Sequence, residues 1–318
     1  MRNIFNHRTA AVVFVTASCA LAWQAQKKQN NGPRPYPVAP DVANARYGPH
    51  ERNVFDLWKA KTGRPSPLVI FIHGGGFTAG DKTALSPALL NGCREKGIAV
   101  ATINYRYSTI APYPAPMEDG ARALQYIRLH AKEWNINPKA VACTGGSAGA
   151  GISLWIGFHD DMAQPASDDP VMRQSTRISV VGVTNAQTSY DPRFIAKLID
   201  ERTGRHPALA RLFGVPQGED VMTAKDKFRL YDDGAPVMHL SAGDPPVFMF
   251  YNRELHLPPS DLGEGIHSPQ FGLDLKPRMN KLGIECIVRT PKDYPDGSAA
   301  AKSNEEMIAF FQKYFPKD

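Results

Sequence analysis

Apolar runs separated by amphipathic segments recur along most of this chain. Residues 52–58 alternate polar and apolar side chains, which predicts an outer antiparallel strand with one face in the core. Residues 67–72 are continuously apolar, as is typical of a central strand covered on both faces. Further strands are predicted at residues 98–104, 140–144, 178–183, 247–251 and 284–289.

Helical spacing of apolar residues occupies the segments between most of these strands. Helices are predicted at residues 86–96, 116–133, 148–158 and 305–314, and in the segment that ends at residue 282. Strands that alternate with helices predict an α/β fold with a mainly parallel central sheet flanked by helices. The alternation fails between residues 190 and 240, which predicts a cap-like insertion over one end of the sheet. A surface excursion with no role in ligand choice is the alternative.

Two glycine-rich motifs directly follow predicted strands. Residues 73–77 read His-Gly-Gly-Gly-Phe, and residues 145–149 read Gly-Gly-Ser-Ala-Gly. The second fits the G-x-S-x-G turn that exposes a nucleophilic serine, here Ser147, between a strand and a helix. The first fits a loop whose backbone amides stabilise an oxyanion, with His73 holding the loop by hydrogen bonds. The predicted oxyanion donors are the backbone N–H groups of Gly74, Gly75 and Ala148.

The motifs together carry a resemblance to a known group of proteins. The matching residues are 73–77, 104–106, 137–138 and 145–149, with Asp119 in the helix between them. On these residues the chain resembles α/β-hydrolase fold esterases of the hormone-sensitive-lipase and feruloyl/acetyl-esterase-like carboxylesterase group. The resemblance covers residues 50–185 well and the last third loosely. It implies an α/β-hydrolase fold, a serine acyl-enzyme mechanism and no cofactor or metal, with Asp119 supporting the fold.

The catalytic histidine of that group has no counterpart at its usual place. The group's triad runs serine, acid, histidine along the chain. The acid normally follows the strand at 247–251, where Glu254 is the nearest carboxylate. The histidine normally follows the last strand, but residues 291–297 contain none. We therefore expect His267 as the base, with His256 as second choice, and Glu254 as the acid that orients it. A helix-entry or substrate-binding His267 and a solvated Glu254 are the alternatives.

Length, charge and the N-terminal segment indicate the number of domains, the kinds of partner and the cellular location. The 318 residues fit one large domain, and the formal net charge of +6 comes from scattered Lys and Arg, which does not favour nucleic-acid binding. Arg2, Arg8 and the apolar stretch 10–21 predict a signal peptide over residues 1–22. Lipidation at Cys19 and an uncleaved membrane anchor are the alternatives. The three cysteines of the mature chain are expected to be buried thiols.

These expectations define a provisional organisation and function. After the signal peptide, residues 23–44 are expected to form a flexible linker, and residues 45–318 the α/β-hydrolase domain. The expected function is a secreted or periplasmic serine carboxylic-ester hydrolase acting on small-molecule or polysaccharide esters, such as acetyl or feruloyl esters. No stable membrane span is expected in the mature chain. A non-catalytic binding protein that kept the hydrolase pocket is the main alternative, and a peptidase of the same fold is the third.

Overall fold

A computed structural model describes residues 36–317 of the chain. The predicted signal peptide and residues 23–35 of the predicted linker lie outside the described residues. Among the residues described, no helix is both long enough and apolar enough to cross a membrane.

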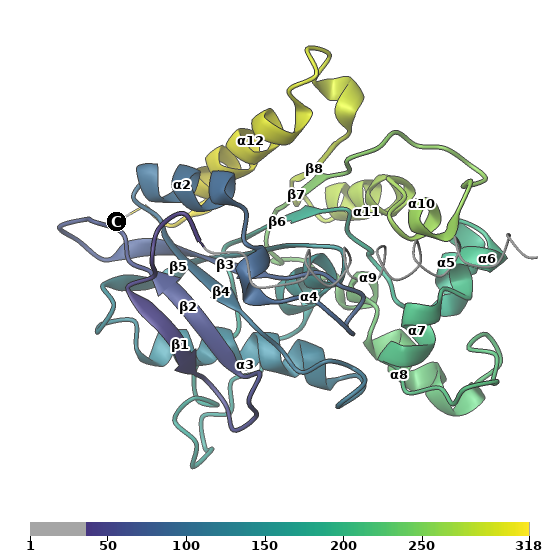
Figure 1. Cartoon of the computed structure of the whole chain (residues 1–318), viewed down its shortest axis with the longest axis horizontal. Helices are drawn as coiled ribbons and strands as arrows, with labels where there is room; N and C mark the ends of the chain where they lie inside the picture. Colours follow the sequence, from purple (N-terminus) through teal and green to yellow (C-terminus); the bar gives the residue numbers. More distant parts are fainter. Residues whose placement is uncertain (1–35, 318) are drawn as a thin grey trace, which may run out of the picture. The chain divides into compact units, whose positions relative to one another are not determined.

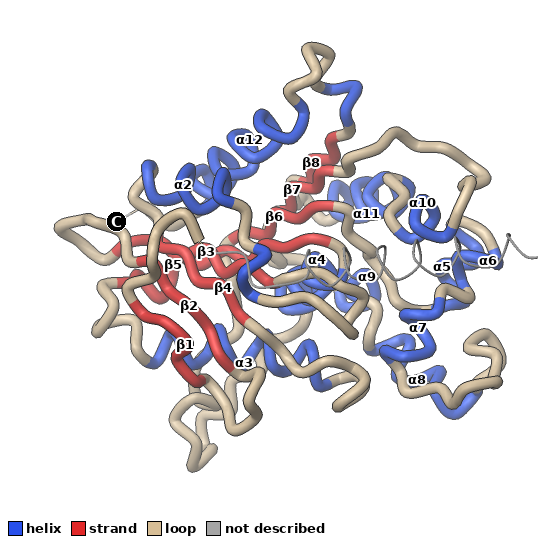
Figure 2. The backbone as a smooth tube through the Cα atoms, in the orientation of Figure 1, coloured by secondary structure: helices blue, strands red, loops and turns tan. Residues whose placement is uncertain are grey.

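Eight strands form one sheet, in the order β1-β2-β4-β3-β5-β6-β7-β8 (Figures 1 and 2). The strands are β1 (Val42–Arg46), β2 (Val54–Trp58), β3 (Ser66–Ile72), β4 (Ala99–Ile103), β5 (Ile136–Gly146), β6 (Val180–Thr184), β7 (Val247–Phe250) and β8 (Cys286–Arg289). The β1–β2 and β2–β4 pairs are antiparallel and every other pair is parallel. The carboxyl ends of six strands therefore share one edge, and ligands bind at that edge in open α/β sheets.

Helices cover both faces of the sheet, so the domain has three layers. They are α2 (Pro87–Glu95) and α12 (Ala299–Tyr314) on one face, and α3 (Ala115–Leu129), α4 (Ala148–Phe158) and α11 (Gln270–Lys281) on the other. In Figure 1, α2 and α12 lie together above the sheet. Each face has its own hydrophobic core cluster. The continuously apolar runs are thus strands buried on both sides, as their sequence predicts.

The start of the domain differs from the sequence prediction. Residues 42–44 were expected to belong to a flexible linker, but they form part of β1, which pairs with β2. Before β1, the Tyr36 ring packs on Trp58 with a centroid separation of 4.6 Å, and the Trp58 indole donates a hydrogen bond to the Val38 carbonyl. This edge strand buries few of its side chains, so its sequence lacks the apolar pattern that would reveal it.

The expected insertion consists of short helices. These are α5 (Pro192–Leu198), α6 (Glu201–Gly204), α7 (Pro207–Leu212), α8 (Phe228–Asp233) and α9 (Pro236–His239). Residues 190–240 are all described, and none of them is in a strand. A further short helix, α10 (Leu262–Ile266), precedes α11. The segment therefore interrupts the strand–helix alternation as its sequence indicates.

The cysteines of the described residues behave as the sequence predicts. Cys93, Cys143 and Cys286 are all free and buried. Burial raises the pKa of each thiol to about 12. A thiol with so high a pKa is a poor nucleophile, so these side chains contribute packing to the core.

Candidate active site

The register of the central strands places the two glycine motifs side by side. Ile72 at the end of β3 pairs with Gly145 near the end of β5. A Cβ atom on Gly145 would lie 2.4 Å from the Ile72 carbonyl oxygen, and a Cβ on Gly149 would lie 2.0 Å from the same atom. Real Cβ atoms do not approach oxygen so closely. Both glycines are therefore required for β3, β5 and α4 to meet at this point.

Ser147 occupies a strained turn between β5 and α4. Its φ of 52° and ψ of −120° lie in a region that side-chain-bearing residues rarely adopt. The backbone N–H of Ser147 donates to the Thr184 carbonyl at 3.0 Å, which ties the turn to the end of β6. This is the geometry of a nucleophile elbow, which lifts the hydroxyl above the sheet. Ala148 is the first residue of α4, so its N–H has no partner within the helix.

The glycine loop after β3 lies against that elbow. A Cβ on Gly74 would lie 2.7 Å from the Gly146 carbonyl oxygen, so only glycine allows the two segments to approach this closely. Gly75 has a φ of 110°, and its carbonyl accepts hydrogen bonds from Thr78 and Ala79. The predicted oxyanion donors Gly74, Gly75 and Ala148 therefore come from two segments in contact beside Ser147.

His73 supports the glycine loop instead of facing the serine. Its Nδ1 lies 2.7 Å from the Gly74 carbonyl oxygen, and its Nε2 lies 3.2 Å from an Arg52 guanidinium nitrogen. Because arginine can only donate, Nε2 accepts and Nδ1 carries the proton. Burial lowers the pKa of His73 to about 4. The imidazole is thus neutral and structural, as the sequence predicts.

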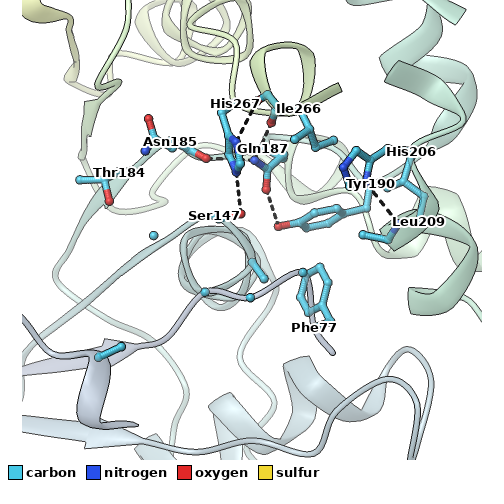
Figure 3. A pocket seen from close by; sticks show the side chains of 18 of the residues that line it. Phe77, Ser147, Thr184, Asn185, Gln187, Tyr190, His206, Leu209, Ile266 and His267 are labelled. Carbon is cyan, nitrogen blue, oxygen red and sulfur yellow. Dashed lines mark hydrogen bonds between the residues drawn. The ribbon is translucent and has the colours of Figure 1, made fainter. Parts of the chain in front are cut away.

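His267 reaches the serine hydroxyl. Its Nε2 lies 2.9 Å from Ser147 Oγ, and its Nδ1 lies 2.9 Å from the Gly263 carbonyl oxygen (Figure 3). Because the carbonyl can only accept, Nδ1 carries the proton and Nε2 has a free lone pair toward the serine. His267 is the C-cap residue directly after α10, and the first turn of that helix supplies Gly263. One short helix therefore holds the ring and fixes its tautomer.

The surroundings of His267 favour its neutral form. Burial lowers its pKa below the usual 6.5, and the positive charge of Arg253 acts in the same direction. The hydrogen bond to Gly263 raises the pKa, with an effect smaller than that of burial and larger than that of Arg253. A neutral imidazole at pH 7 is the form that can accept a proton from a serine hydroxyl.

The structure does not bring Glu254 to His267. The Glu254 carboxylate accepts hydrogen bonds from Thr290 Oγ1 at 3.0 Å and from the Lys292 backbone N–H at 2.6 Å. β7 and β8 are adjacent parallel strands, so the loop after β7 meets the loop after β8 and not the α10 turn. The expected Glu254–His267 pair is therefore corrected to a Gly263–His267 pair. His256, the second choice for the base, has its Nδ1 3.4 Å from the Glu264 carboxylate and is well exposed.

Gln187 is a buried polar residue that the sequence did not single out. Its side-chain N–H₂ donates to the Ile266 carbonyl at 2.6 Å and to the Asn185 carbonyl at 2.9 Å. The Tyr190 hydroxyl donates to its Oε1 at 3.3 Å. Ile266 directly precedes His267, so Gln187 anchors the histidine turn to the end of β6 (Figure 3). Its position just beyond a parallel strand was the one signal available in the sequence.

Ser147 and His267 lie in a cavity of about 690 Å³. Apolar side chains line much of it, including Phe77, Tyr190, Leu209 and Ile266. His206, Ala208 and Leu209 come from the insertion, which therefore helps to form the cavity. His206 Nδ1 accepts from the Ala208 N–H at 3.2 Å, so its proton is on Nε2. Burial lowers the pKa of His206, which makes it a neutral donor in the cavity wall.

The motifs and the surrounding strands match one protein family. The model of the family BD-FAE matches residues 55–260, which is more than half of the chain. The chain belongs to the BD-FAE family. The match includes both glycine motifs and the whole insertion, and it ends before His267. Membership of BD-FAE, together with the esterase relatives below, confirms the resemblance that the motifs carry.

Several similar proteins of known sequence or structure are esterases by name. The BD-FAE chain is 28% identical over 241 residues to the probable carboxylic ester hydrolase LipM of Mycobacterium tuberculosis (strain ATCC 25618 / H37Rv). The match covers 73% of this chain and 51% of LipM, so the chain spans about half the length of that relative.

Solved structures show the same fold. A truncated carbohydrate esterase from gut microbiota superposes with a TM-score of 0.68 at 18% identity, covering 89% of this chain and 99% of that one. An acetyl ester-xyloside bifunctional hydrolase from Caldicellulosiruptor lactoaceticus superposes with a TM-score of 0.65 at 20% identity. The match covers 87% of this chain and 98% of that one. At these identities the likeness establishes the α/β-hydrolase fold of this BD-FAE member and nothing finer.

Proposed function

We propose that this chain is a serine carboxylic-ester hydrolase that works through an acyl-enzyme on Ser147, with His267 as its general base. The observation that carries the proposal is the 2.9 Å contact between Ser147 Oγ and His267 Nε2 beside two glycine-rich loops. A serine hydroxyl alone is almost wholly protonated at neutral pH and is a weak nucleophile. A neutral imidazole in hydrogen-bond contact supplies the missing base.

The reaction follows from these positions. Ser147 Oγ attacks the ester carbonyl carbon while its proton moves to His267 Nε2. The N–H groups of Gly74, Gly75 and Ala148 stabilise the oxyanion that forms, and each such donor contributes about 3–4 kcal/mol. The tetrahedral intermediate collapses, the Nε2 proton goes to the departing alkoxide, and the acyl group stays on Oγ. Water then attacks the acyl-enzyme with His267 again as the base, which releases the acid.

The group that orients the base distinguishes this mechanism from the usual one. In the common triad a carboxylate accepts from Nδ1 and stabilises the imidazolium that forms. Here the Gly263 carbonyl accepts from Nδ1. A carbonyl dipole fixes the same tautomer but stabilises positive charge less than a full negative charge does. We therefore expect slower turnover than a complete triad would give.

The cavity and the relatives support esters of carbohydrates as the substrate class. Apolar residues on one side of Ser147 suit an acyl group, and the neutral His206 Nε2–H can donate to an oxygen of the alcohol part. The similar structures named above include a carbohydrate esterase and an acetyl ester-xyloside hydrolase. We propose acetyl or feruloyl esters of polysaccharides that the protein meets after export. Export itself rests on the predicted signal peptide.

Short-chain p-nitrophenyl esters and a fluorophosphonate probe test the proposal. The unmodified chain should hydrolyse p-nitrophenyl acetate and become labelled at Ser147. Ser147→Ala should lose both properties. Ser153→Ala is the matched control, because Ser153 is a buried serine of the same helix that only donates to the Gly149 carbonyl. Hydrolysis that survives in Ser147→Ala would contradict the proposed nucleophile.

The same experiment separates the hydrolase from a non-catalytic binding protein. A binding protein that kept the pocket would neither hydrolyse the ester nor react with the probe, while Ser147→Ala would fold and bind ligands as well as the unmodified chain. The absence of a histidine from the loop after β8, at residues 291–297, motivates that alternative. The contact of His267 with Ser147 favours the hydrolase.

A further inference from the structure

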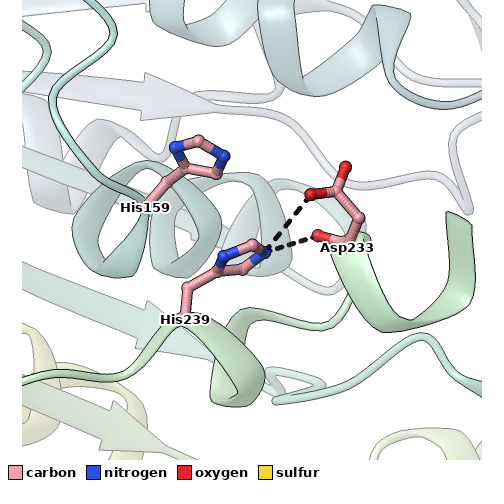
Figure 4. Close-up of side chains that lie close together, drawn as sticks. All are labelled: His159, Asp233 and His239. Carbon is pink, nitrogen blue, oxygen red and sulfur yellow. Dashed lines mark hydrogen bonds and ion pairs between the residues drawn. The ribbon is translucent and has the colours of Figure 1, made fainter. Parts of the chain in front are cut away.

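Two histidines and an aspartate converge at the far end of α4 from Ser147. His159 directly follows α4, Asp233 ends α8 and His239 ends α9. One nitrogen or oxygen of each side chain lies within 4.8 Å of the others (Figure 4). α4 has eleven residues, so the cluster lies about 16 Å along the helix from the serine. It is therefore separate from the candidate active site.

We propose that His159, Asp233 and His239 form a binding site for a divalent transition metal of the zinc type. Two imidazoles and one carboxylate are donors that zinc accepts, with water completing the tetrahedron. Donor atoms around a tetrahedral zinc ion are about 3.4 Å apart. The donor atoms, now within 4.8 Å of one another, have to approach by about 1 Å or more to reach that spacing, and the half-exposed Asp233 side chain has the freedom to move.

Hydrogen bonds already orient two of the three donors. The Asp160 carbonyl lies 3.1 Å from His159 Nδ1, which places the proton there and leaves His159 Nε2 free for a metal. The Tyr113 hydroxyl donates to one carboxylate oxygen of Asp233 and leaves the other free. Partners of this kind are the usual support of metal ligands in proteins.

The third donor, His239, has to give up its hydrogen bond to the Asp233 backbone carbonyl when it binds the metal. His239 Nε2 lies 2.6 Å from the backbone carbonyl of Asp233 and 3.9 Å from its carboxylate. On binding, the His239 ring loses its Nε2 proton and takes one on Nδ1, so the imidazole stays neutral. The Asp233 carbonyl keeps the hydrogen bond that it accepts from the Trp155 indole at 3.1 Å.

A metal at this place would join the insertion to the central domain. His159 belongs to the end of α4, and the other two donors belong to helices of the insertion. The Trp155 ring packs on His159 with a centroid separation of 4.4 Å and limits water on that side. The bound ion is thus expected to stabilise the insertion in the position where it lines the cavity.

Zinc titration of the full chain without an affinity tag tests the site. After removal of metals with a chelator, Zn²⁺ should compete successfully with a chromophoric zinc indicator at one ion per chain. His159→Ala and His239→Ala should each weaken binding by at least about tenfold. His130→Ala is the control and should bind as the unmodified chain does, because His130 lies outside the cluster, beside the Glu133 carboxylate and the Trp134 ring. Equal zinc binding by the cluster variants and the unmodified chain would overturn the proposal.

Thermal unfolding gives a second readout that does not depend on esterase activity. Zn²⁺ should raise the unfolding midpoint of the unmodified chain and leave that of Asp233→Asn unchanged. Asparagine keeps the size of the side chain and an acceptor for the Tyr113 hydroxyl, so this variant should fold. An equal rise with Mg²⁺, which prefers oxygen ligands, would contradict an imidazole site.

Discussion

His267 Nε2 lies 2.9 Å from Ser147 Oγ, although 120 residues separate the two along the chain. The contact joins the elbow between β5 and α4 to the residue that directly follows α10. The histidine comes before β8 in the sequence, whereas the esterase group that the chain resembles has it after that strand. The fold thus brings the proposed base to the serine from a different place in the chain order.

Removal of the His267 imidazole should abolish most of the esterase activity. His267→Ala should lower kcat for p-nitrophenyl acetate by about 10³-fold, because general-base catalysis typically contributes 10²–10⁴. Steady-state kinetics measure the effect. His256→Ala should behave as the unmodified chain does, since His256 is well exposed and pairs with Glu264. A larger loss in His256→Ala than in His267→Ala would reverse the assignment.

The pH dependence of kcat/KM should follow the neutral form of His267. Its pKa is lowered below 6.5, so activity should be fully present at neutral pH and fall as the pH drops through that lowered pKa. Arg253→Gln removes a positive charge that disfavours the imidazolium, so the acid limb should move to higher pH. Arg278→Gln, which removes a surface charge paired with Asp274, serves as the control. An acid limb that moves to lower pH in Arg253→Gln would contradict this account.

Gln187 should act as a positioning residue for the histidine turn. Gln187→Ala removes the hydrogen bond to the Ile266 carbonyl, so we expect kcat to fall by about tenfold with little change in KM. Gln187→Glu should be at least as impaired, because a carboxylate cannot donate to that carbonyl. Gln174→Ala removes a half-buried glutamine whose side chain donates one long hydrogen bond, to the Pro170 carbonyl, and should have no effect on kcat. A change confined to stability would show that Gln187 is structural only.

Glu254→Gln tests whether a carboxylate orients the base. Because Glu254 binds Thr290 and Lys292, we expect kcat within about twofold of the unmodified value and a stability loss of about 1–3 kcal/mol. Urea unfolding and ester kinetics on the same samples give both numbers. Loss of the orienting carboxylate in a complete triad lowers kcat about 10⁴-fold. A loss of that size here would place Glu254 in the catalytic machinery.

Gly149→Ala should disrupt the contact between the elbow and β3. The added Cβ would lie 2.0 Å from the Ile72 carbonyl oxygen, which outweighs the gain in helix propensity of about 1 kcal/mol. We expect destabilisation of several kcal/mol, seen as a lower unfolding midpoint or a loss of soluble protein. Gly63→Ala is the matched control, because a Cβ there meets nothing within 4 Å. Equal midpoints for the two variants would refute the close-contact argument.

Sequence patterns predicted the elements that bury a clear apolar face and missed those that bury little. The run at residues 67–72 predicted β3 because both of its faces lie in apolar cores. β1 escaped notice because only part of it is covered. α12 begins at Ala299 and not at residue 305, since its first turn is mostly exposed and lacks the apolar stripe. A buried face requires apolar residues at regular spacing, and that spacing is what makes an element predictable from the sequence.

The sequence by itself determined the nucleophile turn and the glycine loop. Both depend on backbone conformations and close approaches that only particular residues allow. A few neighbouring residues in the sequence are therefore enough to predict them. Only the tertiary structure decided that His267 meets Ser147, that Gly263 replaces Glu254 beside it, and that Gln187 anchors the turn. Those contacts depend on how α10 packs over the ends of β5 and β6. Packing between distant segments leaves no periodic signal in the chain.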